Sequence, residues 1–407
     1  MKVVHVSHSD LSGGAAIAAY RIHRALRSPG VDSTMAVNQS TSGDWTVQGP
    51  NKVTQKLTML RPSVGYVFRQ RLKTTNGAPH SVAVLPSSWP DKLNHSDVDI
   101  VNLHWVNGEM LSVADIGKLR KPVVWTLHDM WAFCGAEHYT NDHRWREGYW
   151  RHNRPVYEGG FDLNRWTWHR KRKHWRKPIQ IVTPSQWLAD CVRKSALMGD
   201  WPVTVIPYPI DANLWQPVDK GLARQLLHLP QHAPLLLFGA SGGTADPRKG
   251  FDLLRAALDR LRGENPGLEL VVFGQGEPKQ APDLGFPVHY MGRLQDPLSL
   301  RVLYSAADAM VVPSRQEAFG QTASEAHACG TPVIAFKVGG LPDIVDHLKT
   351  GYLAAPFDIE DLARGVQWVL AEGDRSKNLG EAARQKALTL WTPEVVGNLY
   401  IQLYNSF

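Results

Sequence analysis

The sequence has few cysteines and no long apolar run. It contains 407 residues, and its three cysteines (Cys134, Cys191 and Cys329) lie far apart. An odd and scattered set of cysteines implies no disulfide framework. No apolar run approaches the roughly 20 residues that a membrane-spanning helix requires. His5 and His8 interrupt the apolar N-terminal stretch, which is wrong for a secretory signal peptide, so we expect a cytoplasmic protein.

Length and composition indicate a soluble protein with two domains. A chain of 407 residues is too long for one ordinary hydrophobic core. Hydrophobic residues make up 43% of the chain and charged residues 20%, as in soluble globular proteins. The net charge of +7 is concentrated in residues 144–177, which contain eleven Lys or Arg and three Asp or Glu. This segment therefore carries the basic character of the whole chain.

The most informative stretch is residues 309–335, with the sequence AMVVPSRQEAFGQTASEAHACGTPVIA. An apolar run of strand type ends at Pro313, a loop follows, and small helix-compatible residues occupy 322–328 before a second strand over 331–336. This order is typical of a parallel sheet, in which ligands bind at the carboxyl ends of strands and anions at helix N-termini. The stretch therefore predicts a ligand site.

The polar residues of this stretch are spaced for such a site. Glu317, Phe319 and Gly320 lie in the loop, and Glu325 lies on the helix. If the helix begins near Gly320, then Glu325 is about one and a half turns into it and faces the same crevice as Glu317. Glycine at position 320 lets the backbone approach a ligand closely.

Two histidines follow predicted strands in the first half of the chain. Strands over 98–104 and 122–127 end with His104 and His128. A histidine at the carboxyl end of a strand points into the crevice of an open α/β sheet, where polar groups bind or react. For His104 a structural role stays open beside a functional one.

A glycine turn follows the first predicted strand, residues 2–7. Gly13 and Gly14 precede a run with helical spacing. A glycine-rich turn between a strand and a helix is a phosphate-approaching device. Beyond it, residues 31–94 are less periodic, and we expect only a strand near 33–38 and a helix near 53–73.

Two groups of residues could be drawn as metal sites, and neither is convincing. Asp97 and Asp99 open a strand instead of closing one, which places them away from the crevice. The second group has one cysteine and no second ligand pair. It consists of Cys134, His138, Asp142 and His143. We expect no metal site.

Residues 132–177 interrupt the α/β alternation with an aromatic and basic insertion. Eight of the fifteen tryptophans lie between Trp125 and Trp187. Interleaved Trp, Arg and Lys can bind nucleic acid or the surface of an anionic membrane. A helical hairpin over 164–176 with a solvated basic face is the third interpretation, and all three stay open. The densest basic cluster is Arg170, Lys171, Arg172, Lys173, Arg176 and Lys177.

The stretch 309–335 resembles the Glu-x7-Glu motif of family 4 glycosyltransferases, which have the GT-B fold. The match extends over E-A-F-G-x-x-x-x-E-A-x-A-x-G-x-P-V-I-A. The resemblance implies that Glu317 orients the donor sugar and that Glu325 binds the ribose hydroxyls. It also makes His128, in W-T-L-H-D, the match to the family's active-site histidine, which contacts the donor sugar. Gly13 and Gly14 resemble the family's N-terminal glycine loop.

Further matches lie in the second half of the chain. The family's Lys-Gly signature makes Lys249 the cation beside the diphosphate. The arginine usual six residues earlier is replaced by Gly243, and Arg248 is the candidate substitute. Gly274 and Gly276 resemble the family's glycine turn near the diphosphate, and residues 288–293, which end at Arg293, resemble the stretch whose backbone contacts the nucleobase in the family.

The resemblance implies an α/β protein with the GT-B fold, in which two Rossmann-like doubly wound domains face a cleft. We expect an N-terminal domain on the acceptor side over 1–206 and a nucleotide-sugar domain over 218–385, joined by a linker over 207–217. An amphipathic helix over 389–403, within a C-terminal segment 386–407, would cross back to the first domain.

The expected activity is retaining, metal-independent hexosyl transfer from a nucleotide-diphospho-sugar, such as a UDP- or GDP-sugar, to a saccharide or lipid-linked acceptor. Cell-surface polysaccharide synthesis at the inner face of the membrane, with peripheral membrane contact and no cofactor, fits this interpretation, and no nucleic acid partner is expected. The alternatives are a nucleic-acid-binding protein that uses the insertion, and an inactive GT-B scaffold that binds sugar.

Overall fold

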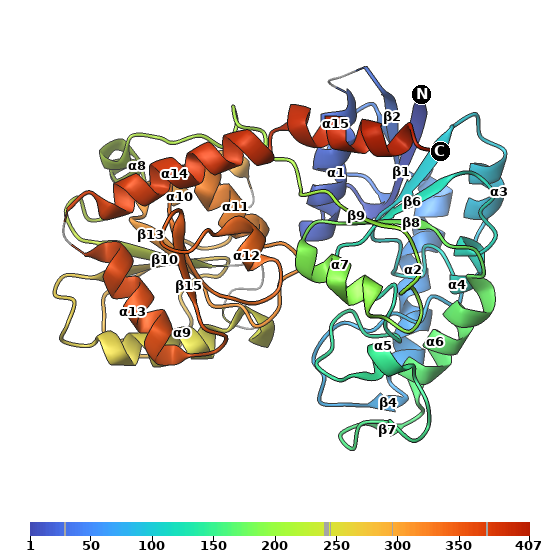
Figure 1. Ribbon diagram of the computed structural model, residues 1–407, viewed down its shortest axis with the longest axis horizontal. Helices are drawn as coiled ribbons and strands as arrows, with labels where there is room; N and C mark the ends of the chain where they lie inside the picture. The colour runs from blue at the N-terminus through green and yellow to red at the C-terminus, as the bar shows by residue number, and fades with distance from the viewer. Residues whose placement is uncertain (28–29, 240–243, 245, 295, 372) are drawn as a thin grey trace. The chain divides into compact units, whose positions relative to one another are not determined.

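The chain folds into two compact units. The computed structural model describes residues 1–407 except 28–29, 240–243, 245, 295 and 372 (Figure 1). The first unit comprises Met1–Pro209 and Val396–Phe407, and the second comprises Ile210–Val395. Gly243, the position of the missing arginine, lies outside the described residues.

The first unit is built on a parallel sheet of seven strands in the order β3-β2-β1-β5-β6-β8-β9. The central strands are short apolar runs that are buried along almost their whole length, as expected for a parallel sheet with helices on both faces. The strands are β1 (Lys2–Ser9), β2 (Asp32–Gln39), β3 (Val47–Gln48), β5 (Ile100–Leu103), β6 (Val123–Thr126), β8 (Gln180–Thr183) and β9 (Val203–Val205).

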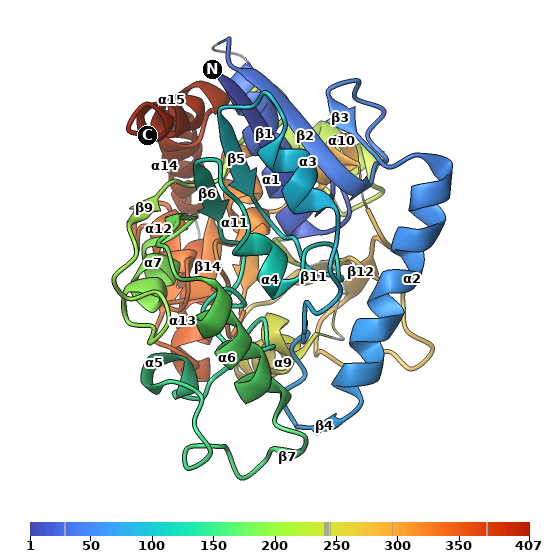
Figure 2. The same cartoon turned by 90° about the vertical axis from the view of Figure 1, so that its right-hand side faces the viewer.

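Helices and one small antiparallel pair of strands complete the first unit (Figure 2). Strands β4 (Leu72–Lys73) and β7 (Gly159–Gly160) form that pair. The helices are α1 (Gly14–Arg27), α2 (Lys52–Arg69), α3 (Trp89–Asn94), α4 (Val113–Ile116), α5 (Arg144–Glu147), α6 (Leu163–His174), α7 (Gln186–Arg193) and α15 (Pro393–Tyr404).

The insertion directs much of its aromatic and basic character inward. Residues 164–176, interpreted as a helical hairpin, belong instead to the single helix α6 and its C-terminal end. Lys171 is fully buried, and its ammonium donates hydrogen bonds to the backbone carbonyls of Trp131, Cys134 (3.1 Å) and Gly135 (2.7 Å). The tryptophans buried in this region are Trp125, Trp131, Trp145, Trp168 and Trp175. Part of the basic cluster is therefore structural.

The second unit is a parallel sheet of six strands in the order β12-β11-β10-β13-β14-β15. The strands are β10 (Leu235–Gly239), β11 (Glu269–Phe273), β12 (Val288–Tyr290), β13 (Ala309–Val312), β14 (Val333–Phe336) and β15 (Gly351–Ala354). The helices are α8 (Lys220–Leu226), the 3-10 turn η2 (Pro247–Lys249), α9 (Phe251–Leu261), α10 (Pro297–Ala306), α11 (Gln321–Ala328), α12 (Leu341–Ile344), α13 (Ile359–Leu370) and α14 (Arg375–Leu390).

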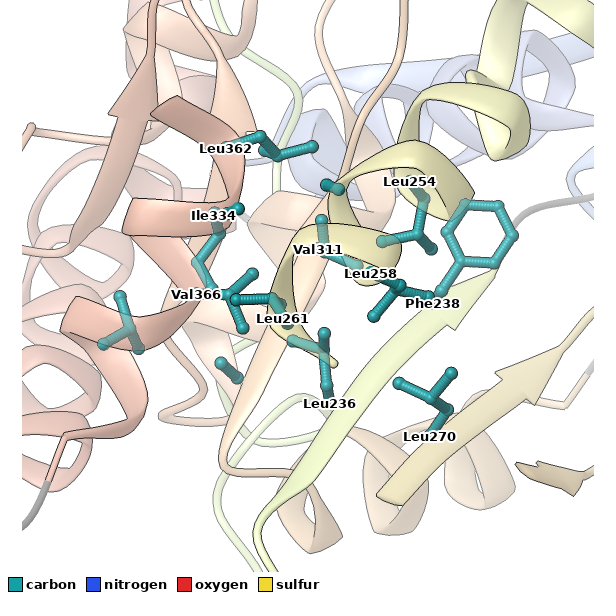
Figure 3. Close-up of a cluster of buried hydrophobic side chains, with 14 of the residues drawn as sticks. Leu236, Phe238, Leu254, Leu258, Leu261, Leu270, Val311, Ile334, Leu362 and Val366 are labelled. Carbon is teal, nitrogen blue, oxygen red and sulfur yellow. The ribbon is translucent and has the colours of Figure 1, made fainter. Parts of the chain in front are cut away.

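One face of this sheet packs on helices α9 and α13 (Figure 3). Strand residues such as Leu236, Val311 and Ile334 contribute the sheet side of the core, while Leu258 of α9 and Val366 of α13 contribute the helix side. Burial of each such side chain stabilises the fold by about 1.5–3 kcal/mol. This core fixes the strands whose carboxyl ends carry the candidate site.

The C-terminal helix differs from the expectation of one helix over 389–403. Helix α14 ends at Leu390, and a new helix, α15, begins at Pro393, because proline lacks the N–H that a helix interior needs but fits the first helical turn. From Val396 onward, helix α15 belongs to the first unit. The Tyr404 hydroxyl accepts a hydrogen bond from Asn102 Nδ2 at 2.7 Å on β5. None of the helices in the described part of the chain is long and apolar enough to cross a membrane.

Candidate functional site

The second unit brings two predicted site residues into direct contact. Glu317 follows β13 and Lys249 follows β10. Lys249 Nζ lies 2.5 Å from Glu317 Oε1, which also accepts a hydrogen bond from Ser314 Oγ at 3.0 Å. Both charged side chains are only partly exposed, so this ion pair is formed in a surrounding that screens it less than open solvent does.

Gly250 explains why the lysine reaches the glutamate. The turn η2 ends at Gly250, whose φ is +69°. A Cβ atom at this position would lie 2.0 Å from the carbonyl oxygen of Pro313, at the end of β13. Only glycine permits so close an approach. In addition, Arg315 N donates to Arg248 O at 2.7 Å, so backbone contacts hold the turn directly against the loop that carries Glu317.

Arg248, the candidate substitute for the missing arginine, pairs with its own turn. Its guanidinium lies 2.7 Å from Asp246 Oδ2, and its backbone N–H donates to Asp246 Oδ1 at 3.0 Å. Burial raises the pKa of Asp246, but the hydrogen bonds from Arg248 outweigh that effect and leave the pKa below its usual value. The structure therefore places Arg248 beside Lys249 in sequence without directing it at Glu317.

The other residues of the Glu-x7-Glu motif have different environments. Gly320 is the N-cap of α11. Glu325 is buried on that helix, and its Oε2 accepts a hydrogen bond from Tyr304 Oη at 3.2 Å. Phe319 is buried, with its ring edge-on to Trp391, so its side chain packs in the unit and fixes the loop before Gly320.

Sequence reasoning did not assign three groups around these glutamates. They are Ser314 on Glu317, Tyr304 on Glu325, and the glycine turn before α12. In that turn, Gly340 N donates to Glu317 O at 2.9 Å, and a Cβ at Gly339 would lie 2.4 Å from the same oxygen. The signal available for the turn is its Gly-Gly-Leu-Pro sequence, since proline is favoured in the first turn of a helix, but this sequence does not identify Glu317 as the partner.

Two predicted glycines and an arginine follow the neighbouring strands. Gly274 comes after β11, and its N–H donates to Gly292 O at 2.8 Å, just beyond β12. Gln275 Oε1 accepts from Thr244 N and Thr244 Oγ1, each at 2.9 Å. Gly276 and Arg293 are exposed at the same ends of the strands. Four adjacent strands, β10 to β13, thus each carry predicted residues at their carboxyl ends, where ligands of parallel sheets bind.

In the first unit, His128 is the end of a hydrogen-bonded row of imidazoles. Its Nε2 lies 3.1 Å from Nδ1 of His104, and Nε2 of His104 lies 2.8 Å from Nδ1 of His5. The other ring nitrogen of His128, Nδ1, lies 2.6 Å from the hydroxyl of Tyr208. His128 follows β6, His104 follows β5 and His5 lies in β1, and these three strands are neighbours in the sheet.

Burial keeps this histidine row neutral. It lowers the pKa of His128 to about 4 and holds the pKa values of His104 and His5 well below 6.5. A neutral imidazole has one donor and one acceptor nitrogen, so the direction of each hydrogen bond fixes the direction of the next. Both ring nitrogens of His128 have protein partners. A sugar hydroxyl that bonds to either of them must replace Tyr208 or His104.

The remaining candidates of the first unit have simpler surroundings. Gly13 lies between β1 and α1, and Gly14 is the first residue of α1. A Cβ at Gly13 would have no atom within 4 Å, which leaves space beside the turn. Asp97 and Asp99 both interact with Lys2, through its ammonium at 2.5 Å and its backbone N–H at 2.7 Å. Across the described residues, no group of three or more His, Cys, Asp or Glu is placed to hold a metal ion.

Two sequence models of known families match consecutive parts of the chain. Residues 12–214 match the family described as Glycosyltransferase Family 4. Residues 237–386 match the family described as Glycosyl transferases group 1. The first match contains the histidine row except His5, and the second contains Lys249, Glu317 and Glu325.

Curated relatives are similar over part of their length. A D-inositol 3-phosphate glycosyltransferase of Segniliparus rotundus is 35% identical over 190 residues, covering 44% of this chain and 42% of that protein. A glycogen synthase of Mycobacterium tuberculosis is 31% identical over 236 residues, covering 56% of this chain and 54% of that protein. The chain spans about half the length of the curated relatives it matches.

Solved structures match over the whole chain. A sucrose-phosphate synthase from Thermosynechococcus elongatus has a TM-score of 0.67 at 21% identity and covers 100% of this chain and 99% of its own. Anabaena Alr3699/HepE in complex with UDP-glucose has a TM-score of 0.67 at 16% identity and covers 100% of both chains. WaaG, a glycosyltransferase involved in lipopolysaccharide biosynthesis, has a TM-score of 0.63 at 18% identity, with 98% and 99% covered. At these identities the likeness concerns the fold.

Proposed function

Because the chain belongs to glycosyltransferase family 4 and has the GT-B fold, we propose that it is a retaining glycosyltransferase that uses a nucleotide-diphospho-sugar. The observation that carries the proposal is the contact of Lys249 with Glu317 at the carboxyl ends of β10 and β13. These two residues are 68 positions apart, and their contact supports a ligand site there, because parallel sheets bind ligands at the carboxyl ends of their strands.

The donor half of the reaction needs positive charge. When the sugar leaves, negative charge develops on the nucleoside diphosphate, and fixed cations and N–H donors stabilise it. Lys249 supplies an ammonium, and the N-terminus of α11 after Gly320 supplies backbone N–H groups. We assign the diphosphate to these groups without a metal ion. Structures of similar fold contain UDP and UDP-glucose, which makes UDP-sugars the first donors to test.

The two glutamates have separate roles in this proposal. Glu317, held by Lys249 and Ser314, orients the reacting sugar. Glu325, held by Tyr304, accepts hydrogen bonds from the ribose hydroxyls. His128, in the first unit, is assigned to the donor sugar by the family resemblance alone, and a sugar hydroxyl bound to it would take over one of its two present hydrogen bonds. Transfer with retention of anomeric configuration follows from the family resemblance.

The acceptor is a saccharide or a lipid-linked saccharide in cell-surface polysaccharide synthesis at the inner face of the membrane. WaaG, which shares the fold, is named for lipopolysaccharide biosynthesis, and this supports that acceptor class. The curated relatives named for D-inositol 3-phosphate make an inositol phosphate the second acceptor to test. A nucleic acid partner is disfavoured because the buried tryptophans of the insertion cannot stack on bases.

The test is a panel of nucleotide sugars. Thermal unfolding of the purified protein with UDP-, GDP- and ADP-sugars identifies the donor, because a ligand that binds the folded state raises its stability. Transfer is then measured by mass spectrometry with each acceptor class. We expect Lys249→Ala to abolish the stabilisation and the exposed-lysine control Lys349→Ala to retain it. Stabilisation by no nucleotide sugar would contradict the proposal.

A further inference from the structure

Helix α2 carries large apolar side chains on a solvent-exposed face. Met59, Leu60, Tyr66 and Val67 are each between 56% and 68% exposed. Leu60, Tyr66 and Val67 lie one, seven and eight residues after Met59, and this spacing places all four on one side of a helix. The helix is attached to the unit by other residues. Arg61, for example, donates to the carbonyl oxygens of Glu109 at 2.6 Å and Leu85 at 2.8 Å. The apolar face is therefore not needed for packing in the unit.

A second exposed apolar group adjoins the end of this helix. Val156, Tyr157 and Phe161 flank β7 and are all at least 42% exposed. Strand β7 pairs with β4, which follows α2 closely, and Phe161 N donates to the carbonyl oxygen of Arg71 at 2.9 Å. Figure 2 shows α2 running down one side of the unit towards β4 and β7. We call the two groups together the α2–β7 surface. Exposed apolar residues occur singly on most proteins, and a gathering of them indicates an interaction site.

The same two segments contain basic residues and hardly any acidic ones. No Asp or Glu occurs between Asp44 and Asp91, whereas six Lys or Arg do. No Asp or Glu occurs between Glu147 and Glu158, and Glu158 is buried beside Arg144. The exposed basic side chains next to the apolar groups are Lys56, Arg71, Lys73 and Arg151. The α2–β7 surface is thus apolar and rimmed by positive charge.

We propose that the α2–β7 surface docks the protein on an anionic lipid bilayer. A helix with an apolar face and basic residues lies in the headgroup region, with its apolar side chains at the acyl boundary and its cations near the lipid phosphates. The surface also contains three aromatic rings, Tyr66, Tyr157 and Phe161, which could stack on nucleobases. Its most exposed members, however, include the aliphatic side chains of Met59, Leu60 and Val156, which suit acyl chains and offer a nucleobase no ring to stack on, and this favours lipid over nucleic acid. Docking itself needs no substrate. The inference rests on the proposed function only where it relates this surface to a lipid-linked acceptor in the membrane.

The proposal moves the membrane contact away from the basic cluster of α6. Within that cluster Lys171 is buried, and Arg170 donates to the carbonyl oxygens of Val82 at 2.7 Å and Ala83 at 2.8 Å. The exposed basic residues of the cluster are Arg172, Lys173, Arg176 and Lys177. Helix α6 has no large apolar side chain exposed beside them. The α6 cluster therefore serves as a matched control for charge.

The experiment measures flotation of the full chain with vesicles of phosphatidylcholine, with and without phosphatidylglycerol, at low and high salt. One variant removes charge from the α2–β7 surface (Lys56→Gln, Arg71→Gln, Lys73→Gln), and its control removes three exposed charges from the end of α6 (Arg172→Gln, Lys173→Gln, Arg176→Gln). A second variant removes apolar side chains (Leu60→Ser, Val67→Ser, Val156→Ser). Its control changes three exposed leucines of the second unit (Leu222→Ser, Leu226→Ser, Leu298→Ser).

We expect the wild type and both controls to float with anionic vesicles. The charge variant should lose about fivefold in partitioning per removed cation at low salt and little at high salt. The apolar variant should lose on the order of tenfold per side chain at both salt concentrations. Circular dichroism checks that the variants are folded. If the apolar variant does not fold, the charge variant alone tests the proposal. The proposal is wrong if the wild type stays unbound, if the α6 control loses binding instead, or if folded surface variants float as the wild type does. If the wild type floats with anionic vesicles but transfers no sugar from any donor, the proposed function is wrong and the docking proposal still holds.

Discussion

Replacing Gly250 with alanine tests how the site is held together. The new Cβ would lie 2.0 Å from the carbonyl oxygen of Pro313. Real Cβ contacts are not shorter than 3.0 Å, so the turn that carries Lys249 must move by about 1 Å or more. The left-handed backbone at Gly250 adds about 1 kcal/mol of strain for any residue with a Cβ. We therefore expect Gly250→Ala to separate Lys249 from Glu317 and to destabilise the second unit.

The effect on catalysis should exceed the effect on stability. A misplacement of about 1 Å in a catalytic group can lower turnover by about 100-fold, whereas the strain alone leaves the folded state dominant. Turnover is measured with the donor found in the panel, and stability by urea unfolding. Gly263→Ala is the matched control, because Gly263 has a φ of +79° and a Cβ added there would have no atom within 4 Å. It shares the strain without the clash.

The outcomes are distinct. The control should lose about 1 kcal/mol of stability and keep wild-type turnover. Gly250→Ala should lose both, and nucleotide binding should weaken as well because Lys249 is displaced. Wild-type turnover in a folded Gly250→Ala variant would refute the idea that contact with Pro313 positions Lys249, and equal losses in both variants would assign the effect to backbone strain.

Three further predictions follow from the site. Glu325→Ala should weaken nucleotide-sugar binding by about 1.5–3 kcal/mol, the range for a charged hydrogen bond, and Tyr304→Phe by about 0.5–1.5 kcal/mol; calorimetric affinities equal to wild type would contradict the ribose assignment. A chelator should leave transfer unchanged, and activity restored only by added manganese or magnesium would refute metal independence. Since burial lowers the pKa of His128 to about 4, the unfolded chain binds the proton first, and the stability that His128 contributes should fall by about 3 kcal/mol as the pH drops from about 6.5 to about 4. Urea midpoints across this range should show a smaller slope in folded His128→Gln than in His232→Gln, a change of an exposed histidine.

The sequence predicted the sheets better than the contacts between their ends. Short apolar runs such as residues 122–127 could be recognised as buried parallel strands, and β6 lies within that range. The resemblance to a family pointed to both Lys249 and Glu317. The fit of Gly250 against Pro313 could not be foreseen, because it depends on how β13 lies beside β10 and on a carbonyl direction that no local pattern encodes.

The insertion shows a different limit of sequence reasoning. The buried positions of α6 include Asn164, Trp168 and Lys171, which have the helical spacing of a core-facing stripe. A lysine on such a stripe is expected to reach solvent, since burying its charge is unfavourable. Here three backbone carbonyls of residues 131–135 surround the ammonium. Charge counting therefore overestimated the exposed basic surface, because the acceptors were backbone atoms of another segment.

The return of α15 to the first unit has a consequence for synthesis on the ribosome. Residues 1–209 emerge first, yet their unit also includes residues 396–407. Tyr400 and Tyr404 are buried and hydrogen-bond to Thr126 and Asn102. Domains fold as units while the chain grows, so the second unit, which is continuous, can complete its fold before the first. Until residues 396–407 emerge, the docking place of α15 on residues 1–209 stays uncovered, and a stop codon before residue 396 would damage the first unit although most of its residues are made before the second unit.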